Sequence, residues 1–334
     1  MILTILKPGL FTSVQDLGRY GFQQYGVITS GAMDQIAHRI SNILVGNSEH
    51  APTLEITMIG PKLKFNQDCL IAICGGKAEP KIDGASIKCW RPVLVKQGSV
   101  LEFGTISEGC RAYLAIAGGF NIPIVLNSRS TYFRAKLGGF KGRTLKAGDQ
   151  ISIDTPSALS KRLINTLNNK QTQKPFHEAN WLINSSIVPS YREHPSIRVI
   201  KGRHFDLFDQ ASQTKFFENT FSILPQSDRM GYRLTGPRLS LTEQHEMISE
   251  AVSFGTIQVP ADGNPIILLA DHQTTGGYPK IGQIAAVDLP LIAQAKPGTK
   301  VRFIEITLAQ AQLLFLQRER LISELKQGIQ SRFR

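Results

Sequence analysis

The feature that most constrains the fold is a succession of short, strand-like runs that fill most of the chain. Each run is apolar or alternates apolar with polar residues, and Gly, Pro, Asn or Asp separates it from the next; examples are ILTIL, CLIAIC, AYLAIAGG, IRVIKG, TIQVP, IILLA, IAAVDL and VRFIEI. Runs of about five residues that are rich in β-branched side chains are typical of antiparallel sheets and barrels. The sequence therefore predicts a mainly β fold.

Helices are expected to be few, and two segments carry their signals. In the segment 32–47, apolar residues repeat at the spacing of one helix face. Ser30 is expected to cap the start of this helix, and Gly46 to end it. A second helix is expected from about residue 308 to about residue 327, where mixed charges suit a solvent-facing side.

The length of the chain and an internal repeat both indicate two domains. At 334 residues the chain exceeds the roughly 250–300 residues at which single hydrophobic cores stop growing. Short motifs of the first half recur in the same order in the second, where DLGRYG, GPKL, GGF and KAG are matched by DRMG, GPRL, GGY and KPG. We expect an N-terminal β-domain over 1–155, a polar connecting segment over 156–195, a C-terminal β-domain over 196–307 and a helix over 308–334.

No segment of the sequence indicates secretion or a membrane span. The first residues, MILTILKPGLFTSVQD, lack a basic stretch followed by a long apolar run, and no run approaches the roughly 20 apolar residues of a membrane helix. The four cysteines, Cys69, Cys74, Cys89 and Cys110, show no CxxC spacing and are expected to be buried free thiols. We expect a cytoplasmic protein.

A formal net charge of +12 raises the question of an anionic partner. No acidic residue occurs between Glu108 and Asp149, whereas this stretch holds glycines and many basic residues. Arg134, Lys141 and Arg143 are the candidates for a second anion site, which would take phosphate or carboxylate. A solvated basic loop and a nucleic-acid surface are the alternatives, and the scarcity of aromatic residues interleaved with basic ones disfavours nucleic acid.

Several common catalytic signatures are missing from the sequence. It has no GxxxxGK[ST] phosphate loop, no GxGxxG, no HExxH zinc motif and no GxSxG nucleophile elbow. It also lacks the MKM sequence to which biotin is attached. These absences argue against the conventional nucleotide, zinc and serine-hydrolase classes, and no metal site is expected.

A polar glycine loop, ADHQTTGGYPKIG, offers residues for a small-molecule site. The loop covers residues 270–282 and places Asp271 beside His272, so that a proton could pass between them. The backbone of Thr274, Thr275, Gly276 and Gly277 is a candidate to bind an oxyanion through its N–H groups, with Lys280 to balance the charge. The alternative is a purely structural turn with a structural histidine.

A second loop, SDRMGYRLTG, crowds charged residues around a glycine turn between two strands. Asp228 would keep Arg229 oriented, and the forked guanidinium groups of Arg229 and Arg233 suit a carboxylate or phosphate. Tyr232 and Tyr278 either contact the substrate or fill the mouth of a barrel. The alternative for the Asp–Arg pair is an ion pair that only braces the turn.

Long segments of the chain resemble one known family. The segments PGLFTSVQDLGRYGFQQYGV, SGAMDQIAHRISNILVGN, LEITMIGP, RSTYFRAKLGGFKGR, SDRMGYRLTGP, GTIQVPADGNPI and ADHQTTGGYPKIG are similar to those of the allophanate hydrolase subunit 2 (AHS2) family. That family is also called the KipA or biotin-dependent carboxyltransferase family, and it includes the C subunit of 5-oxoprolinase. The resemblance runs from about residue 2 to about residue 304.

This resemblance implies a fold, partners and an activity. The implied fold is two cyclophilin-like β-barrel domains with a few helices, and the implied partner is a KipI/AHS1-type protein, the B subunit of 5-oxoprolinase. For stand-alone bacterial members, the implied activity is ATP-dependent hydrolysis of 5-oxo-L-proline to L-glutamate, together with the LamB/YcsF-type A subunit. ATP and Mg²⁺ are thus implied for the complex, because phosphorylation of the lactam oxygen would open its carbon to water.

Within the implied function, the residue roles are hypotheses from side-chain chemistry. Arg229, Arg233 and Lys280 contact the anionic substrate or phosphoryl group, Asp228 orients Arg229, and His272 transfers a proton. One alternative is a KipA-like regulatory protein that binds and antagonises a KipI-type kinase inhibitor. Another is a carboxyltransferase or allophanate hydrolase-related subunit, which would need a separate biotin carrier because this chain has no biotin segment.

Overall fold

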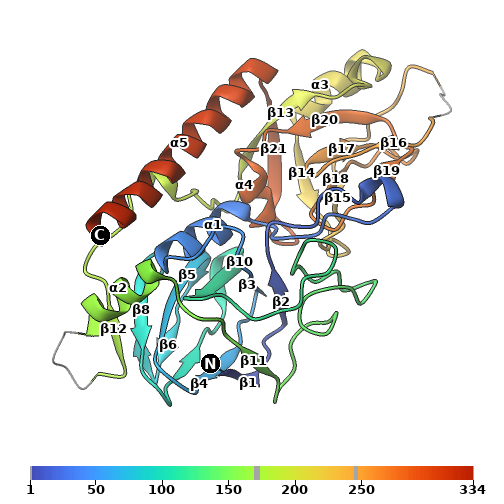
Figure 1. The fold of residues 1–334 in the computed structure, drawn as a ribbon. Coiled ribbons are helices and arrows are strands. Elements are labelled where there is room, and N and C mark those ends of the chain that lie inside the picture. Colours follow the sequence, from blue (N-terminus) through green and yellow to red (C-terminus); the bar gives the residue numbers. More distant parts are fainter. Residues whose placement is uncertain (1, 169–173, 244–246, 334) are drawn as a thin grey trace. The chain divides into compact units, whose positions relative to one another are not determined.

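The computed structural model describes residues 2–168, 174–243 and 247–333, and the chain forms two compact units. Unit 1 consists of Met1–Gly18, Asp34–Pro189 and Arg320–Arg334, and unit 2 consists of Arg19–Met33 and Ser190–Glu319. Strands dominate both units and helices are few (Figure 1). The predicted mainly β fold is therefore confirmed.

Unit 1 is built on two six-stranded antiparallel sheets that enclose one apolar core. The first sheet has the order β11 (Gln150–Ser152), β1 (Ile2–Lys7), β4 (Lys62–Phe65), β9 (Val100–Glu102), β6 (Lys81–Ile82) and β7 (Ala85–Ser86). The second has the order β12 (Phe176–Glu178), β8 (Pro92–Val95), β5 (Cys69–Ala78), β10 (Ile106–Ile116), β3 (Thr53–Thr57) and β2 (Phe11–Gln15). Leu3 and Ile5 of β1 both enter the core because alternate residues of a strand point to the same face.

Helix α1 (Gln35–Leu44) packs on β5 and β10 of unit 1. The prediction that Ser30 caps this helix is wrong, because the carboxylate of Asp34 accepts the capping hydrogen bond from the N–H of Ala37 at 3.0 Å. Ser30 has a left-handed φ of 56° and lies outside the helix, four residues before the N-cap residue Asp34. Gly46, with a φ of 77°, follows the last turn as predicted.

The predicted connecting segment 156–195 contributes structure to unit 1. It forms helix α2 (Ala158–Asn168), strand β12, which pairs with β8, and the 3₁₀ helix η2 (Ser185–Ile187). Buried Leu163 and Leu167 hold α2 against β5, β8 and β12. The division between the units falls between residues 189 and 190, and residues 169–173 of the polar stretch LNNKQTQKP lie outside the described residues.

Unit 2 contains a closed seven-stranded barrel, which confirms the barrel prediction for the C-terminal domain. The strand order is β13 (Ser196–Lys201), β20 (Lys280–Ile284), β17 (Thr256–Gln258), β18 (Ile266–Leu268), β15 (Gly231–Thr235), β14 (Thr220–Ile223) and β21 (Lys300–Glu305). Neighbouring strands are antiparallel except β13 and β21, which are parallel. Inside the barrel, the rings of Phe216 and Phe303 stack with their centroids 4.7 Å apart. A separate two-stranded antiparallel sheet pairs β16 (Glu250–Ala251) with β19 (Thr275–Gly276).

The helical elements of unit 2 are short except for α5. They are η1 (Gln23–Tyr25), η3 (Phe205–Leu207), α3 (Gln210–Glu218), α4 (Leu289–Ala293) and the first part of α5 (Leu308–Arg332), which begins at the predicted residue. The strand expected over IAAVDL, residues 284–289, does not form, because β20 ends at Ile284 and α4 begins at Leu289. Asp288 fixes this change of direction, because its carboxylate accepts hydrogen bonds from the backbone N–H and the guanidinium of Arg198.

The cysteines are free, and Cys69, Cys74 and Cys110 are buried as predicted, while Cys89 is half-buried. Burial raises the pKa of the Cys69 thiol to about 12, which makes it unreactive near neutral pH. Within the described residues, no helix has the length and apolar character needed to cross a membrane.

The internal repeat does not extend to the backbone of its glycine pairs. Gly118 and Gly119 have left-handed φ values of 94° and 77°, whereas Gly276 and Gly277 do not adopt positive φ. The two GG motifs therefore adopt different conformations, and the second pair begins inside strand β19.

Candidate functional site

The two polar loops singled out in the sequence meet because strand pairing continues beyond β15 and β18. The N–H of Leu269 donates to the carbonyl of Met230 at 3.0 Å, and the N–H of Asp271 donates to the carbonyl of Arg229 at 2.8 Å. This pairing aligns Arg229 and Asp271 across the two strands at one end of the barrel. Neighbours in a sheet can thus come from positions that are distant in the sequence.

A buried ion pair forms the centre of this cluster. The Arg229 guanidinium donates through Nε to Oδ2 of Asp271 and through Nη2 to Oδ1, both at 3.0 Å. Nη2 also donates to the carbonyl of Gly31 at 2.6 Å, and the Ser30 hydroxyl donates to Oδ1 of Asp271 at 2.7 Å. The side chains of Arg229 and Asp271 are 9% and 7% exposed. A charge pair this deeply buried is stable only with such additional hydrogen bonds.

Ser30 and Gly31 reach the ion pair through an unusual backbone. Their φ values are 56° and 95°, so two successive residues adopt the left-handed region. A non-glycine residue in that region is strained and persists where surrounding contacts hold it, often at functional sites. The Ser30 hydroxyl and the Gly31 carbonyl, both bonded to the ion pair, supply those contacts.

His272 lies next to the ion pair in a chemically defined state. Its Nδ1 lies 2.5 Å from the Gln273 carbonyl, which only accepts hydrogen bonds, so Nδ1 carries the proton and Nε2 is left as an acceptor in the neutral ring. Burial lowers the pKa of His272 below its ordinary value, against the opposing effects of the Gln273 carbonyl and the Asp271 carboxylate. The ring is therefore neutral at pH 7 and able to take a proton at Nε2.

Several predicted site residues have other structural roles. The carboxylate of Asp271 lies on Arg229, and the carboxylate of Asp228 accepts a hydrogen bond from the N–H of Met230 at 2.8 Å. Tyr232 is a core residue of the barrel, 3% exposed, and its hydroxyl donates to the Ala295 carbonyl. It therefore fills the barrel, as the alternative held. Tyr278 is half-exposed on the loop surface.

The rest of the glycine loop follows from the barrel topology. Strand β17 lies between β18 and β20, so the connection from β18 to β20 has to pass β17. The last residue of β18, Leu268, lies beside the start of β17, because its carbonyl accepts a hydrogen bond from the N–H of Gly255. The chain re-enters the barrel at Lys280, which pairs with Gln258 at the other end of β17. Along this route Thr275 and Gly276 form β19, and the Thr274 carbonyl accepts from Val252. The loop therefore divides between two clusters.

The second cluster surrounds Lys280. Its Nζ donates to Oε2 of Glu250 at 2.8 Å and to the Ala251 carbonyl at 3.1 Å. The other Glu250 oxygen faces the Arg203 guanidinium at 3.1 Å, so one carboxylate bridges two cations. The N–H of Lys280 donates to Nδ1 of His204, and burial lowers the pKa of that histidine. Sequence analysis missed Glu250, Arg203 and His204 because only the barrel register brings them to Lys280.

A row of outward-facing side chains crosses the same end of the barrel. Arg233 pairs with Ile266, Ile266 with Gln258, and Gln258 with Lys280. Directly paired residues of antiparallel strands project to the same face, and Ile257 and Ile281, next to Gln258 and Lys280, point into the core. Gln258 is 1% exposed under the loop and was also missed in the sequence. Two predicted cations, Arg233 and Lys280, thus flank a buried carboxamide.

The second predicted anion site lies in unit 1, where its cations already have partners. Arg143 makes two hydrogen bonds with the Asp149 carboxylate, at 2.7 and 2.8 Å, and this pairing lowers the pKa of Asp149. Lys141 and Arg143 both lie against the ring of Phe140, with centroid distances of 5.2 and 5.5 Å. Arg134 is exposed on the same loop. An anion here would compete with Asp149 for Arg143.

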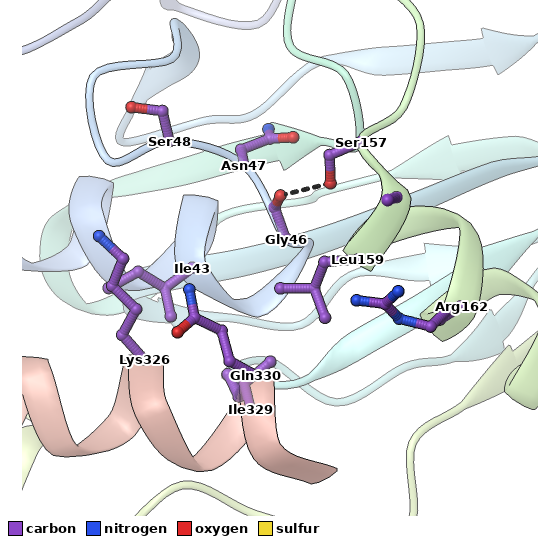
Figure 2. Close-up of a pocket in the computed structure, with 11 residues that line it drawn as sticks. Ile43, Gly46, Asn47, Ser48, Ser157, Leu159, Arg162, Lys326, Ile329 and Gln330 are labelled. Atoms are coloured by element: carbon purple, nitrogen blue, oxygen red, sulfur yellow. Dashed lines mark hydrogen bonds between the residues drawn. The ribbon is translucent and has the colours of Figure 1, made fainter. Parts of the chain in front are cut away.

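A pocket of about 570 Å³ is present in unit 1, and none of the predicted site residues lines it. Figure 2 shows it between the end of α1, the start of α2 and the last turns of α5. The Ser157 hydroxyl donates to the Gly46 carbonyl at 2.8 Å, and Lys326 is paired with Glu49 at 3.0 Å. These polar groups serve the packing of the helices. In the part of the chain that the structure describes, no group of three or more His, Cys, Asp or Glu side chains is placed to hold a metal ion.

Comparison with known proteins gives matches over nearly the whole chain. The family model described as carboxyltransferase domain, subdomain A and B, matches residues 25–305. The chain is 35% identical to the C subunit of 5-oxoprolinase from Haemophilus influenzae, over 97% of this chain and 98% of that protein. It is 36% identical to the C subunit of the Escherichia coli 5-oxoprolinase, over 93% of each protein.

Two solved structures share the fold closely. The K. lactis urea amidolyase and the Kluyveromyces lactis urea carboxylase both match with a TM-score of 0.87, at 31% and 32% identity over 97% and 98% of this chain. The chain spans only 20% and 29% of those much longer chains. On these matches, and in agreement with the resemblance of its loops, the chain belongs to the family of the carboxyltransferase domain, subdomain A and B.

Proposed function

We propose that this chain is one subunit of an ATP-dependent 5-oxoprolinase complex that hydrolyses 5-oxo-L-proline to L-glutamate. The observation that carries the proposal is the end-to-end match with the C subunit of 5-oxoprolinase, which covers 97% of this chain and 98% of the relative. In the urea amidolyases of Lachancea kluyveri and Saccharomyces cerevisiae, the matching region is only 18% and 17% of the protein. A match to the whole of one subunit supports the same role in a complex.

The geometry of unit 2 suits the chemistry that such a reaction needs. A lactam is a stable amide, and its hydrolysis requires that negative charge on the carbonyl oxygen be stabilised while water is deprotonated. Arg229 is a fixed cation with a defined orientation, and His272, which follows its partner Asp271 in the chain, is a neutral proton acceptor. We assign Arg229 to the developing negative charge and His272 to the proton.

ATP and Mg²⁺ enter this proposal as requirements of the complex. The sequence has no glycine-rich phosphate loop, and the described residues hold no cluster of three or more metal-binding side chains. We therefore propose that the partner subunits, one of the KipI/AHS1 type and one of the LamB/YcsF type, contribute to binding the nucleotide and the metal. When bound, ATP would supply the phosphoryl group that activates the lactam oxygen.

The test is glutamate formation from 5-oxo-L-proline by the reconstituted complex. Partner proteins of the KipI and LamB types from the same source are mixed with ATP and Mg²⁺, with and without this chain. Glutamate is expected only when the chain is present. Equal turnover without the chain, or none with all components although the chain binds its KipI-type partner, would reject the proposal and favour a regulatory role.

A carboxyltransferase role is the second candidate, and the description of the matching family favours it. The solved urea carboxylase that matches over 98% of this chain supports the same candidate. Since the sequence lacks a biotin segment, this role requires a separate biotin carrier. Carboxyl transfer to urea, measured with the same mixture of proteins to which a carboxylated biotin carrier is added, separates the two candidates.

A further inference from the structure

We propose that the outer face of the unit 2 barrel, beneath the two-stranded sheet of β16 and β19, binds a small anionic molecule that carries a planar cis-amide. Gln258 pairs with the amide, and Lys280 with Arg203 binds the carboxylate. This inference rests on the proposed function. It names a recognition site for the same kind of molecule, and this site is separate from Arg229 and His272, which lie in the cluster at the other end of β17.

The starting observation is the unpaired carboxamide of Gln258. Its side chain is almost fully buried, and its Nε2 is a buried nitrogen with no hydrogen-bond partner among the described residues. Its neighbour Gln283, on the same outer face, shows the usual situation, because it accepts from the Thr256 hydroxyl and donates to the Phe254 carbonyl, both at 2.9 Å. A buried amide without partners costs stability and is rare in folded proteins. Gln258 therefore needs an explanation that Gln283 does not.

The loop covers this carboxamide without satisfying it. A Cβ added at Gly276 would lie 2.5 Å from Nε2 of Gln258, so only glycine lets the β19 backbone lie this close. The close approach excludes a side chain from position 276 but supplies no hydrogen bond. The cover is thus fitted in shape to Gln258 and leaves its hydrogen-bonding capacity for another molecule.

The complement of a primary carboxamide is a cis-amide. A glutamine side chain presents an N–H donor and a carbonyl acceptor on one edge. A lactam holds its own N–H and C=O on one edge, so the two groups form a pair of hydrogen bonds, whereas the trans amide of an open chain cannot. The substrates in the relatives' names, 5-oxoproline and urea, both have such an edge.

The cations beside Gln258 already hold a carboxylate. Lys280 is the cross-strand partner of Gln258, which places the two side chains on the order of 5 Å apart at their Cβ atoms. The carboxylate of Glu250 forms ion pairs with Lys280 at 2.8 Å and with Arg203 at 3.1 Å, and the Glu250 side chain is only partly buried. Glu250 thus stands where a ligand carboxylate would bind, next to the amide.

Glu250 also belongs to β16, so its ion pair with Lys280 ties the two-stranded sheet to β20. An incoming carboxylate that replaces Glu250 on Lys280 would release this end of the two-stranded sheet and uncover the carboxamide. The site is therefore selective for a molecule that carries both groups, because 2-pyrrolidinone lacks the carboxylate and L-proline lacks the lactam.

Calorimetric titration of the full chain with 5-oxo-L-proline tests the proposal. Gln258→Met should weaken binding at least about tenfold, the loss expected for about 1.4 kcal/mol of hydrogen bonding, and leave Tm unchanged or higher. Glu250→Gln removes the competing charge and should tighten binding. Gln283→Met is the matched control, since it breaks two satisfied hydrogen bonds and should lower Tm while affinity stays within about twofold.

Two results would overturn the site. One is wild-type affinity in folded Gln258→Met, and the other is no binding of 5-oxo-L-proline by the wild-type chain. Failure of this site is separable from failure of the proposed function. If the complex forms glutamate and Gln258→Met leaves its KM unchanged, the proposed function stands and the site is rejected. If 5-oxo-L-proline binding depends on Gln258 but the complex forms no glutamate, the site stands and the proposed function is rejected.

Discussion

Replacing Asp271 by asparagine should destabilise unit 2 strongly. The change keeps the shape of the side chain but removes the charge that faces Arg229, whose guanidinium is 9% exposed and cannot be hydrated in place. It also weakens the hydrogen bond from the Ser30 hydroxyl. Breaking one side of a buried ion pair costs about 3–5 kcal/mol, and the retained amide oxygen places Asp271→Asn near the lower value. For a unit of this size, about 3 kcal/mol corresponds to a fall in Tm of about 10 °C.

Thermal unfolding of the full chain is followed by far-UV circular dichroism and, in parallel, by tryptophan fluorescence. Both tryptophans lie in unit 1, so the fluorescence transition reports that unit while circular dichroism reports both. Asp206→Asn is the control, because Asp206 is an exposed aspartate of unit 2 and its substitution should change stability by no more than about 0.5 kcal/mol. The expected result is an early transition, seen by circular dichroism, in Asp271→Asn alone.

The double variant Arg229→Met with Asp271→Leu separates the charge pair from the packing. Removing both charges avoids leaving one unpaired, so this variant should regain at least half of the stability lost in Asp271→Asn. Turnover of the complex should stay lost, because the proposed cation is gone. A loss below about 1 kcal/mol in Asp271→Asn, or a double variant as unstable as the sum of the single ones, would refute the buried-pair argument.

Three further predictions concern activity, pH and backbone strain. Lys280→Ala should lower turnover of the reconstituted complex by about 10²-fold, and wild-type turnover would reject its assignment. Burial lowers the pKa of His38 to about 4, whereas in the unfolded chain this histidine binds a proton below about pH 6.5. Lowering the pH from about 6.5 to about 4 should therefore reduce the free energy of unfolding of unit 1 by about 3 kcal/mol. Urea unfolding followed by tryptophan fluorescence measures this change, and a free energy that does not vary with pH in this range would contradict the prediction. Gly118→Ala should lower Tm more than Gly98→Ala, because both have left-handed φ but only at Gly118 does the new Cβ meet a backbone carbonyl; equal Tm values would oppose this.

The fold was largely predictable because its signals are local. Runs of alternating apolar residues and the turn residues between them are read within a few positions, and they give the strands and the mainly β class. The start of α1 could not be predicted from the sequence, because Ser30 and Asp34 are both good N-cap residues and the choice between them depends on tertiary contacts. Ser30 is drawn to Asp271 by a hydrogen bond that no local pattern contains.

The candidate site was predictable as a region but not as a set of pairs. The sequence made Asp228 the partner of Arg229 because they are adjacent, whereas barrel pairing brings Asp271 to Arg229 from 42 positions away. In the same way, Glu250 reaches Lys280 from 30 positions away. Contacts of this kind follow from the register of strands, which depends on the whole barrel and not on neighbouring residues.

The glycine loop is a structural connection, and we propose that it is also a site. A connection over β17 needs a close backbone approach, which explains Gly276, but it does not need polar residues beneath it. A purely structural crossing would be most stable over apolar side chains, since an apolar residue at position 258 would avoid the cost of about 1–3 kcal/mol for an unpaired buried amide. The chain keeps Gln258 there, between Lys280 and Arg233. Stability does not account for that choice, whereas the proposed recognition of a ligand amide would.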